Sequence, residues 1–244
     1  MASRVWIFLA AFVFTAITHA SENKAALIKK RVQDFVSSVG PCEKCKSPLT
    51  REAGEAPLGQ TTIKDLHGTE IPMTVMNDEY VLKIFQEMTI QRKIPFGYPE
   101  DGCFARAHEM SYQLDRKGIY TGKVFATGRF RVDNSKAPKG VITWGFHVAP
   151  FVLVDDGKVK KPWVIDPSLF YEPVPIEKWL EKLSEHPLSK LNEVFLTSRF
   201  IYHLRHKDRK LQDFDPEDLK AARKLMRKYL KKDEKRTRRA SAFP

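Results

Sequence analysis

The chain has 244 residues, of which 42% are hydrophobic, and its formal net charge is +12. This length and composition allow one well-buried core, which favours one domain with appendages. Beyond the first twenty residues no segment is apolar enough to cross a bilayer, which excludes a membrane-spanning mature protein. The charge is uneven: residues 201–244 hold 15 Lys and Arg against 7 Asp and Glu, so the rest of the chain is only mildly basic.

The first twenty residues are typical of a signal peptide. Arg4 precedes an apolar run over residues 5–14, and the small residues Thr18 and Ala20 suit a signal peptidase. A membrane anchor is the alternative, but the run is shorter than the roughly 20 apolar residues of a spanning helix. We therefore expect residues 1–20 to be removed and the mature protein to be secreted or periplasmic.

A leader helix and a linker are expected between the signal peptide and the core. Apolar residues recur at helical spacing over residues 27–39, and Gly40-Pro41 ends this pattern. The segment from residue 42 to about residue 62 is rich in Pro, Gly, Lys and Glu without periodicity, which is typical of a linker. The expected organisation is a leader and linker over residues 21–62, a core domain over residues 63–205, and a basic C-terminal helix and tail over residues 206–244.

The core domain combines helical and strand patterns. Asn77 can cap a helix that continues through Met88, after which prolines and Gly97 enforce a loop. That loop leads to Cys103, at the start of a second helical pattern that closes at Gly118. Strands are expected at residues 119–127, 141–154, 159–166 and 194–204, a short helix after Pro175, and a terminal helix from Asp215 with the apolar stripe Leu219, Ala222, Met226 and Tyr229.

Asp155-Asp156-Gly157 predicts a hairpin turn between two of these strands. If Asp156 and Gly157 form the loop, Asp155 pairs with Lys158, and counting outward places His147 directly opposite Asp166. Cross-strand partners on one face have Cβ atoms roughly 5 Å apart, near enough for a carboxylate to accept from an imidazole. The opposite face would then hold Trp144, Phe146 and Val148 beside Trp163 and Ile165.

Cys103 is the candidate nucleophile. Cys42 and Cys45 lie close together in sequence, which leaves Cys103 unpaired in a compartment that favours disulfides. The partial positive charge at the start of a helix favours a thiolate, and the exposed backbone N–H groups can hold an oxyanion. On position alone a buried structural cysteine is an equal alternative. The pairing of His147 with Asp166 favours catalysis, because it supplies a base and a group that orients it.

No other histidine and no metal site fits as well. His108 lies five residues along the helix from the candidate nucleophile and points away from it. His203 and His206 resemble half a metal site but lack further ligands at suitable spacing, so a surface role is favoured. The pair Cys42 and Cys45 lacks a second pair to complete a zinc tetrahedron, so a local disulfide or a dispensable pair is the better interpretation. We expect neither a metal nor an organic cofactor.

Three segments resemble the motifs of the bacterial protein glutaminases, and they occur in the family's order. Tyr98–Met110, which contains Asp101-Gly102-Cys103, resembles the nucleophile motif, Trp144–Ala149 the histidine strand, and Ile165–Phe170 the aspartate motif. The resemblance covers roughly residues 77–205. It implies that Cys103 is the nucleophile, His147 the general acid/base and Asp166 its orienting partner. It also implies an α+β fold with an antiparallel sheet and the cysteine at the N-terminus of a packed helix, as in transglutaminase and papain-like enzymes.

The activity that the resemblance implies is hydrolysis of the side-chain amide of protein-bound glutamine to glutamate, with release of ammonia. Proteins or peptides with exposed glutamines would be the partners. The alternatives are a transglutaminase or cysteine peptidase of the same fold, or a non-enzymatic basic binding module. The basic tail lies outside the resemblance and can reach an anionic surface or polymer, without obligate nucleic acid. We expect deletion of residues 210–244 to leave hydrolysis of a small glutamine peptide nearly unchanged.

Overall fold

The computed structural model describes residues 57–157 and 159–241, together with Lys30. The expected signal peptide, the leader helix and the pair Cys42 and Cys45 lie outside these residues. The elements in chain order are β1 (Gly59–Lys64), β2 (Glu70–Met76), α2 (Asp78–Thr89), α3 (Cys103–Asp115), β3 (Gly122–Asp133), β4 (Val141–Asp155), β5 (Lys160–Val164), β6 (Val174–Pro175), α4 (Ile176–Ser184), β7 (Lys190–Ser198), the 3-10 helix η1 (Leu204–His206) and α5 (Pro216–Ser241).

The strands form one seven-stranded sheet in the order β1-β2-β4-β3-β7, with β5 paired to β4 and β6 paired to β5. All pairings among the described strands are antiparallel except that of β2 with β4, which run parallel over Val75 and Met76 opposite Leu153 and Val154. The expected antiparallel sheet therefore needs one correction. The chain passes through α2, α3 and β3 between β2 and β4, and a crossover of this length permits a parallel pair.

The strands β1 and β2 begin the described domain. The boundary expected between residues 62 and 63 falls inside β1, which pairs antiparallel with β2 from Gly59 opposite Val75 to Lys64 opposite Glu70. Its polar residues resemble a linker in sequence, but exposed and less exposed positions alternate along it, as in an edge strand. The core thus starts about four residues earlier than the sequence indicates.

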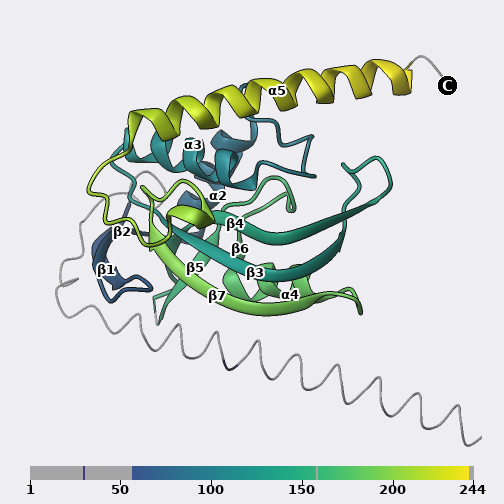
Figure 1. The fold of residues 1–244 in the computed structure, drawn as a ribbon. Coiled ribbons are helices and arrows are strands. Elements are labelled where there is room, and N and C mark those ends of the chain that lie inside the picture. The colour runs from purple at the N-terminus through teal and green to yellow at the C-terminus, as the bar shows by residue number, and fades with distance from the viewer. Residues whose placement is uncertain (1–29, 31–56, 158, 242–244) are drawn as a thin grey trace, which may run out of the picture.

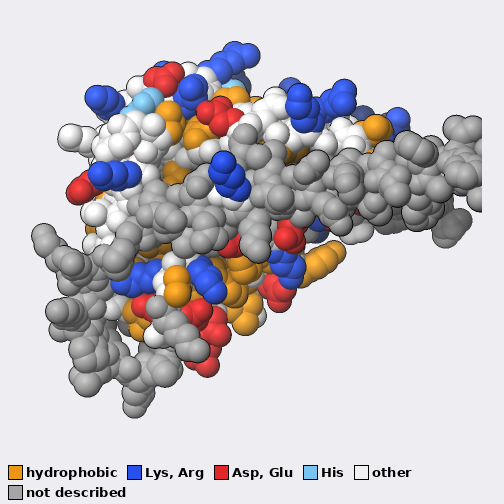
Figure 2. All heavy atoms as spheres, turned by 90° about the horizontal axis from the view of Figure 1, so that it is seen from below, with side chains coloured by type: hydrophobic (Ala, Val, Ile, Leu, Met, Phe, Trp, Pro, Cys, Tyr) orange, Lys and Arg blue, Asp and Glu red, His pale blue; other side chains and the backbone are white. Residues whose placement is uncertain are grey.

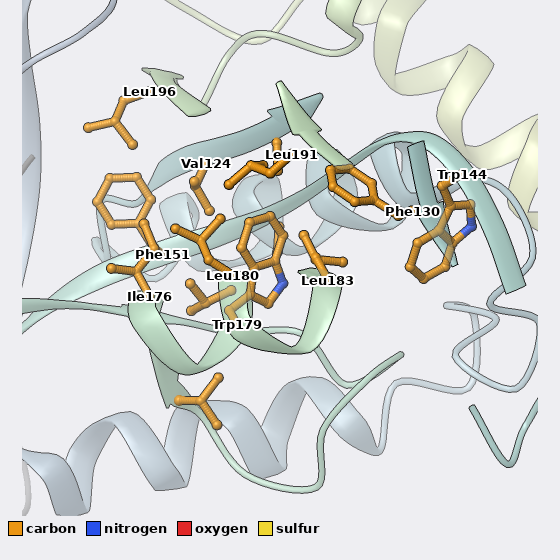
Figure 3. Packing of buried hydrophobic residues seen from close by; sticks show 14 of the residues in the cluster. Val124, Phe130, Trp144, Phe151, Ile176, Trp179, Leu180, Leu183, Leu191 and Leu196 are labelled. Atoms are coloured by element: carbon orange, nitrogen blue, oxygen red, sulfur yellow. The ribbon is translucent and has the colours of Figure 1, made fainter. Parts of the chain in front are cut away.

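Helices cover both faces of the sheet (Figure 1). On one face, Trp179, Leu180 and Leu183 of α4 pack against residues of β3 and β7, as Figure 3 shows. On the other face, α2 and α3 bury residues such as Phe85 and Met110 against Val152 and Val154 of β4. The sheet is therefore the middle layer of the domain, and α3 lies within the molecule with α5 packed outside it.

The terminal helix α5 is part of this core. The apolar stripe expected along it is confirmed, because Leu219, Ala222, Met226 and Tyr229 are all buried. Ala222 and Met226 belong to the same hydrophobic cluster as α2 and α3. The expectation of a separate basic appendage after residue 205 is therefore wrong for this helix: its charged residues solvate the outer face while its apolar stripe packs inward.

The chain between β7 and α5 also differs from expectation. The predicted strand over residues 194–204 begins earlier, at Lys190, and ends at Ser198, and the boundary expected at residue 205 lies in η1.

No helix among the described residues is long and apolar enough to cross a membrane. In Figure 2, which views the molecule from below, Lys and Arg are mixed with Asp and Glu and with hydrophobic side chains.

Candidate active site

Cys103 is the first residue of α3, as expected. The preceding Gly102 is the N-cap residue and has a left-handed backbone conformation with φ of 78°, which glycine adopts without steric cost. No side chain caps this helix start, and its first turn contains no acidic residue. The first N–H groups of an α-helix have no partner within the helix, so those around Cys103 can stabilise an oxyanion.

His147 and Asp166 are in direct contact. His147 Nε2 lies 2.7 Å from Asp166 Oδ2, and both side chains are almost completely buried. The predicted contact is confirmed, but the predicted register is wrong by two residues. Asp155 pairs with Lys160 instead of Lys158, because the turn is longer than two residues. Because the shift is even-numbered, His147 and Asp166 still meet on the same side of the sheet.

Asp166 reaches the histidine from beyond the end of a strand. The strand β5 ends at Val164, opposite Phe151, and the backbone N–H of Ile165 still donates to the Pro150 carbonyl. Asp166 then accepts from the backbone N–H of Ser168. The carboxylate is therefore fixed by a turn and not by the ladder itself.

The electrostatics favour a protonated His147. Burial alone would lower the pKa of His147, but the negative charge and hydrogen bond of Asp166, with a contribution from Cys103, raise it to about 9. Burial would raise the pKa of Asp166, but His147, Trp179 and Arg106 lower it. Nδ1 of His147 has no nitrogen or oxygen partner among the described residues, which leaves this atom for the Cys103 thiol. An imidazolium beside a cysteine stabilises the thiolate.

Two tryptophans hold the histidine and its partner. Trp144 stacks on the His147 ring at 4.3 Å between centroids and 7° between planes, and its Nε1 donates to the Glu100 carbonyl. Trp179 also stacks on the His147 ring, at 5.6 Å between centroids, and donates from Nε1 to Asp166 Oδ2. The predicted register placed Trp144 on the face opposite His147, and no sequence feature pointed to a contact of Trp179 with this pair. The β3–β4 ladder changes register between Thr127 and Phe130, near Trp144, so simple alternation does not hold there.

Arg106 is a further charged group at this site. It is 1% exposed and lies one helical turn after Cys103. Its Nη1 donates to the carbonyls of Tyr98 and Asp101, while Nε and Nη2 have no partner among the described residues. Burial lowers the pKa of Arg106, and the nearby Cys103 and Asp166 oppose that effect. The sequence carried a signal for this residue: an Arg at helical spacing from the nucleophile, amid positions that are otherwise buried.

The other histidines lie away from this contact. His108 is buried beside Lys123, whose Nζ lies 2.9 Å from His108 Nδ1, and burial with the Lys123 charge lowers the pKa of His108 to about 2. His203 is partly buried, with its ring against Phe104, so the expected surface role does not describe it fully. His206 lies 3.6 Å from Asp218. Within the described part of the chain, no group of three or more His, Cys, Asp or Glu residues could hold a metal ion.

Comparison with known proteins gives the context of this geometry. Residues 79–183, which include all three candidate residues, match the family model described as glutaminase. This part of the chain is therefore similar to the glutaminase family. A search of curated proteins found no match.

Solved protein-glutaminase structures share the fold. A crystal structure of protein-glutaminase aligns with 23% identity and a TM-score of 0.52, over 62% of this chain and 85% of that one. The NMR structure of protein-glutaminase from Chryseobacterium proteolyticum aligns with 24% identity and a TM-score of 0.52, over 61% and 85%. These similarities establish the mixed α+β fold of the protein-glutaminase structures. The resemblance found in the sequence is thus confirmed by the family model and by the shared fold.

The alignment with a longer form of the protein is partial. A crystal structure of pro-protein-glutaminase aligns with 26% identity and a TM-score of 0.45, over 50% of this chain. The chain spans 47% of that protein, about half its length.

Proposed function

We propose that the chain is an exported protein glutaminase that uses Cys103, His147 and Asp166 to hydrolyse the side-chain amide of protein-bound glutamine. The observation that carries this proposal is the buried 2.7 Å contact of His147 with Asp166, together with Cys103 at the uncapped start of α3. The family match over residues 79–183 favours glutamine as the amide that is cleaved. The core would then be of the transglutaminase and papain-like kind.

The proposed reaction has two half-reactions. The Cys103 thiolate attacks the carboxamide carbon of the glutamine side chain, and backbone N–H groups in the first turn of α3 hold the oxyanion. His147 donates its proton to the departing nitrogen, so ammonia leaves and a thioester remains. His147 then takes a proton from the water that attacks the thioester. The carbon–sulfur bond breaks, glutamate is released, and the Cys103 thiolate again lies beside the His147 imidazolium. Asp166 keeps the imidazole oriented and stabilises its positive charge.

One experiment separates this activity from those of related thiol enzymes. A folded protein rich in exposed glutamines is incubated with the enzyme and a primary amine, and the intact substrate and its digest are analysed by mass spectrometry. Conversion of glutamine to glutamate in an uncut chain, with ammonia release, is expected. Abundant amine adducts would indicate a transglutaminase, and new chain termini a peptidase. A Cys103→Ala variant is the control for uncatalysed deamidation, and no conversion by the wild type would contradict the proposal.

Export is part of the proposal and has its own test. The apolar run at residues 5–14 and the small residues before position 21 motivate it. The protein is expected in the periplasm or the medium with an N-terminus near Ser21. Intact mass measurement on protein recovered from each fraction tests this. Full-length protein retained in the cytoplasm would contradict it.

The outer face of α5 suits contact with an anionic surface or polymer. Five cations point outward along it, and none has an acidic partner within 4.0 Å among the described residues: Lys224, Arg227, Lys228, Lys231 and Lys235. Attraction between exposed charges fades beyond a Debye length of about 8 Å at physiological salt. Binding to vesicles of anionic phospholipid should therefore weaken with salt and with Lys228→Glu plus Lys231→Glu. Equal binding by both proteins at low salt would contradict this contact.

A further inference from the structure

The C-terminal half of α5 lies over the loop that delivers the nucleophile. In Figure 1, α5 runs across the top of the molecule above α3 and the loop that precedes it. That loop comprises residues 97–102, which lead directly into Cys103. The family match ends at residue 183, so α5 lies outside it. The contacts between α5 and this loop are therefore a feature of this chain that the family match does not describe.

Tyr229 fixes the last two residues of the loop. Its hydroxyl donates to Asp101 Oδ2, while Asp101 Oδ1 accepts from the backbone N–H of Gly102 at 2.6 Å. The Tyr229 ring stacks on Tyr98, with 4.7 Å between centroids. It also lies so close to Gly102 that a Cβ placed there would be 2.6 Å from its Cε2 atom. One side chain of α5 thus touches both ends of the loop and the residue next to the nucleophile.

Arg236 holds two further residues of the same loop, Gly97 and Glu100. Its Nη1 donates to Glu100 Oε1 and its Nη2 to the Gly97 carbonyl, each at 2.6 Å. The guanidinium also lies 5.2 Å from the centre of the Tyr98 ring. The Arg236 side chain is only 25% exposed, so these hydrogen bonds are partly shielded from water. Charge-assisted hydrogen bonds of this kind are stronger than neutral ones.

The inner side of the loop is held by residues of the candidate site. Arg106 donates to the Tyr98 and Asp101 carbonyls, and Trp144 donates to the Glu100 carbonyl. Trp144 in turn stacks on His147. The loop is therefore clamped between the site on its inner side and α5 on its outer side. No side chain caps the start of α3, so these contacts must fix the direction in which Cys103 enters the helix.

We propose that Tyr229 and Arg236 are positioning residues for Cys103, so that α5 is an integral part of the active site. They act through Asp101, Gly102 and Glu100 and do not touch the substrate. A drift of about 1 Å in a reacting group can lower the rate by about 10²-fold, so a loop held on one side only would cost activity. This inference rests on the proposed function where it is tested by glutamine hydrolysis, but not where it is tested by the reactivity of the Cys103 thiol.

The test uses the full-length protein with two single variants and two matched controls. Tyr229→Phe removes only the hydroxyl and keeps the buried ring, and Arg236→Gln removes the charge. Tyr171→Phe is the control for the first, because Tyr171 is exposed. Arg238→Gln is the control for the second, because the Arg238 side chain is 82% exposed and lies two residues further along the same helix. Thermal melting shows whether each variant remains folded.

Two readouts separate positioning from a purely structural role. On a small glutamine peptide, Tyr229→Phe and Arg236→Gln should lower kcat by about tenfold or more with KM changed little, while the controls match the wild type. The second-order rate of Cys103 alkylation by iodoacetamide should fall, because the thiolate loses its fixed place beside His147. Alkylation is quantified on the peptide that contains Cys103, since the chain has three cysteines.

The outcomes are distinct. Unchanged kcat and an unchanged alkylation rate of Cys103 in Tyr229→Phe and Arg236→Gln would overturn the inference. Changes in both, at melting temperatures close to those of the controls, would support it. If a variant is markedly less stable, a double-mutant cycle of Tyr229→Phe with Asp101→Asn decides: non-additive effects on alkylation support the contact, and additive effects overturn it. A wild type that releases no ammonia contradicts the proposed function, but its alkylation still tests the role of α5.

Discussion

The starts of helices α2 and α3 are built in opposite ways. At α2, Asn77 accepts a hydrogen bond from the Tyr80 backbone N–H at 2.8 Å, and Asp78 and Glu79 stand in the first turn. At α3, Gly102 provides no side-chain cap and Cys103 takes the first position. A cap stabilises a helix by about 1 kcal/mol, and acidic residues near its start add to that. The start of α3 has neither a side-chain cap nor an acidic residue, so its N–H groups remain available for a reacting oxygen. Contacts with α5 and Arg106 hold this helix start instead.

The largest effect should come from removing the chemical groups at the α3 start. Cys103→Ser and His147→Ala should each reduce ammonia release by about 10³-fold or more, because no other described side chain supplies a nucleophile or base there. The fold should persist, which circular dichroism and melting can check. Substantial turnover by purified Cys103→Ser would contradict the proposal that the start of α3 carries the nucleophile.

A second large effect concerns the charge of His147. Asp166→Asn should lower the rate by about 10²-fold or more, because an amide orients the imidazole poorly and supplies no charge. The pKa of His147, raised to about 9, should fall toward 6.5, so the alkaline limb of the kcat/KM profile should move to lower pH. A profile measured from pH 5 to 10 checks this. An alkaline limb that stays in place would mean that another group holds the proton.

The same contact predicts how stability depends on pH. The pKa of His147 is higher in the folded state, so its contribution is complete below pH 6.5 and is lost as pH rises through about 9. The pKa of Asp166 is lower in the folded state, so its contribution is present above pH 3.8 and is lost as pH falls through the folded value. Melting temperatures of wild type and Asp166→Asn should therefore differ most between these limits and converge outside them. A constant difference across the whole range would contradict the linkage.

The sequence predicted the positions of Cys103, His147 and Asp166 better than the framework around them. Cys103, His147 and Asp166 are predictable because the turn, the helix start and the strand pattern are local features. The register could not be predicted to the residue, because the length of the Asp156 turn depends on side-chain contacts such as Asp156 with the Val159 N–H. Trp144 was placed on the wrong face because it lies near a ladder irregularity that only pairing with β3 reveals.

The role of α5 was missed for a different reason. Its apolar stripe was visible, but its net charge dominated the interpretation, and no sequence pattern relates residues 97–102 to residues more than a hundred positions later. Arg106 has helical spacing from Cys103, but the sequence alone does not show that α3 is enclosed on nearly every side. Tertiary contacts between distant segments determine both the packing of α5 and the burial of Arg106, and these contacts cannot be derived from composition.

A smaller effect is expected from a substitution of Gly102, the N-cap residue of α3. Gly102→Ala forces an L-residue to φ of 78°, at a cost of about 1 kcal/mol, and places its Cβ against the Tyr229 ring. We expect a melting temperature lower by several degrees and slower alkylation of Cys103. Gly118→Ala is the control, because Gly118 also has a positive φ but a Cβ there would meet nothing within 4 Å. Equal alkylation rates in the two variants would show that Tyr229 does not transmit the change.

The smallest effect should come from the start of α2. Asn77→Ala removes the acceptor for the Tyr80 N–H and should cost about 1 kcal/mol, a fall of roughly 2–4 °C in melting temperature for a chain of this size. Asn77→Asp keeps an acceptor at the same place and adds a charge that the helix dipole favours, so it should melt near the wild type. Because Val81, Ile84 and Phe85 still anchor α2 in the core, neither variant should alter kcat or the alkylation rate of Cys103 well below the melting temperature. A fall in kcat for Asn77→Ala without loss of stability would mean that the capped helix start also serves the chemistry, and the division between the two helix starts would not hold.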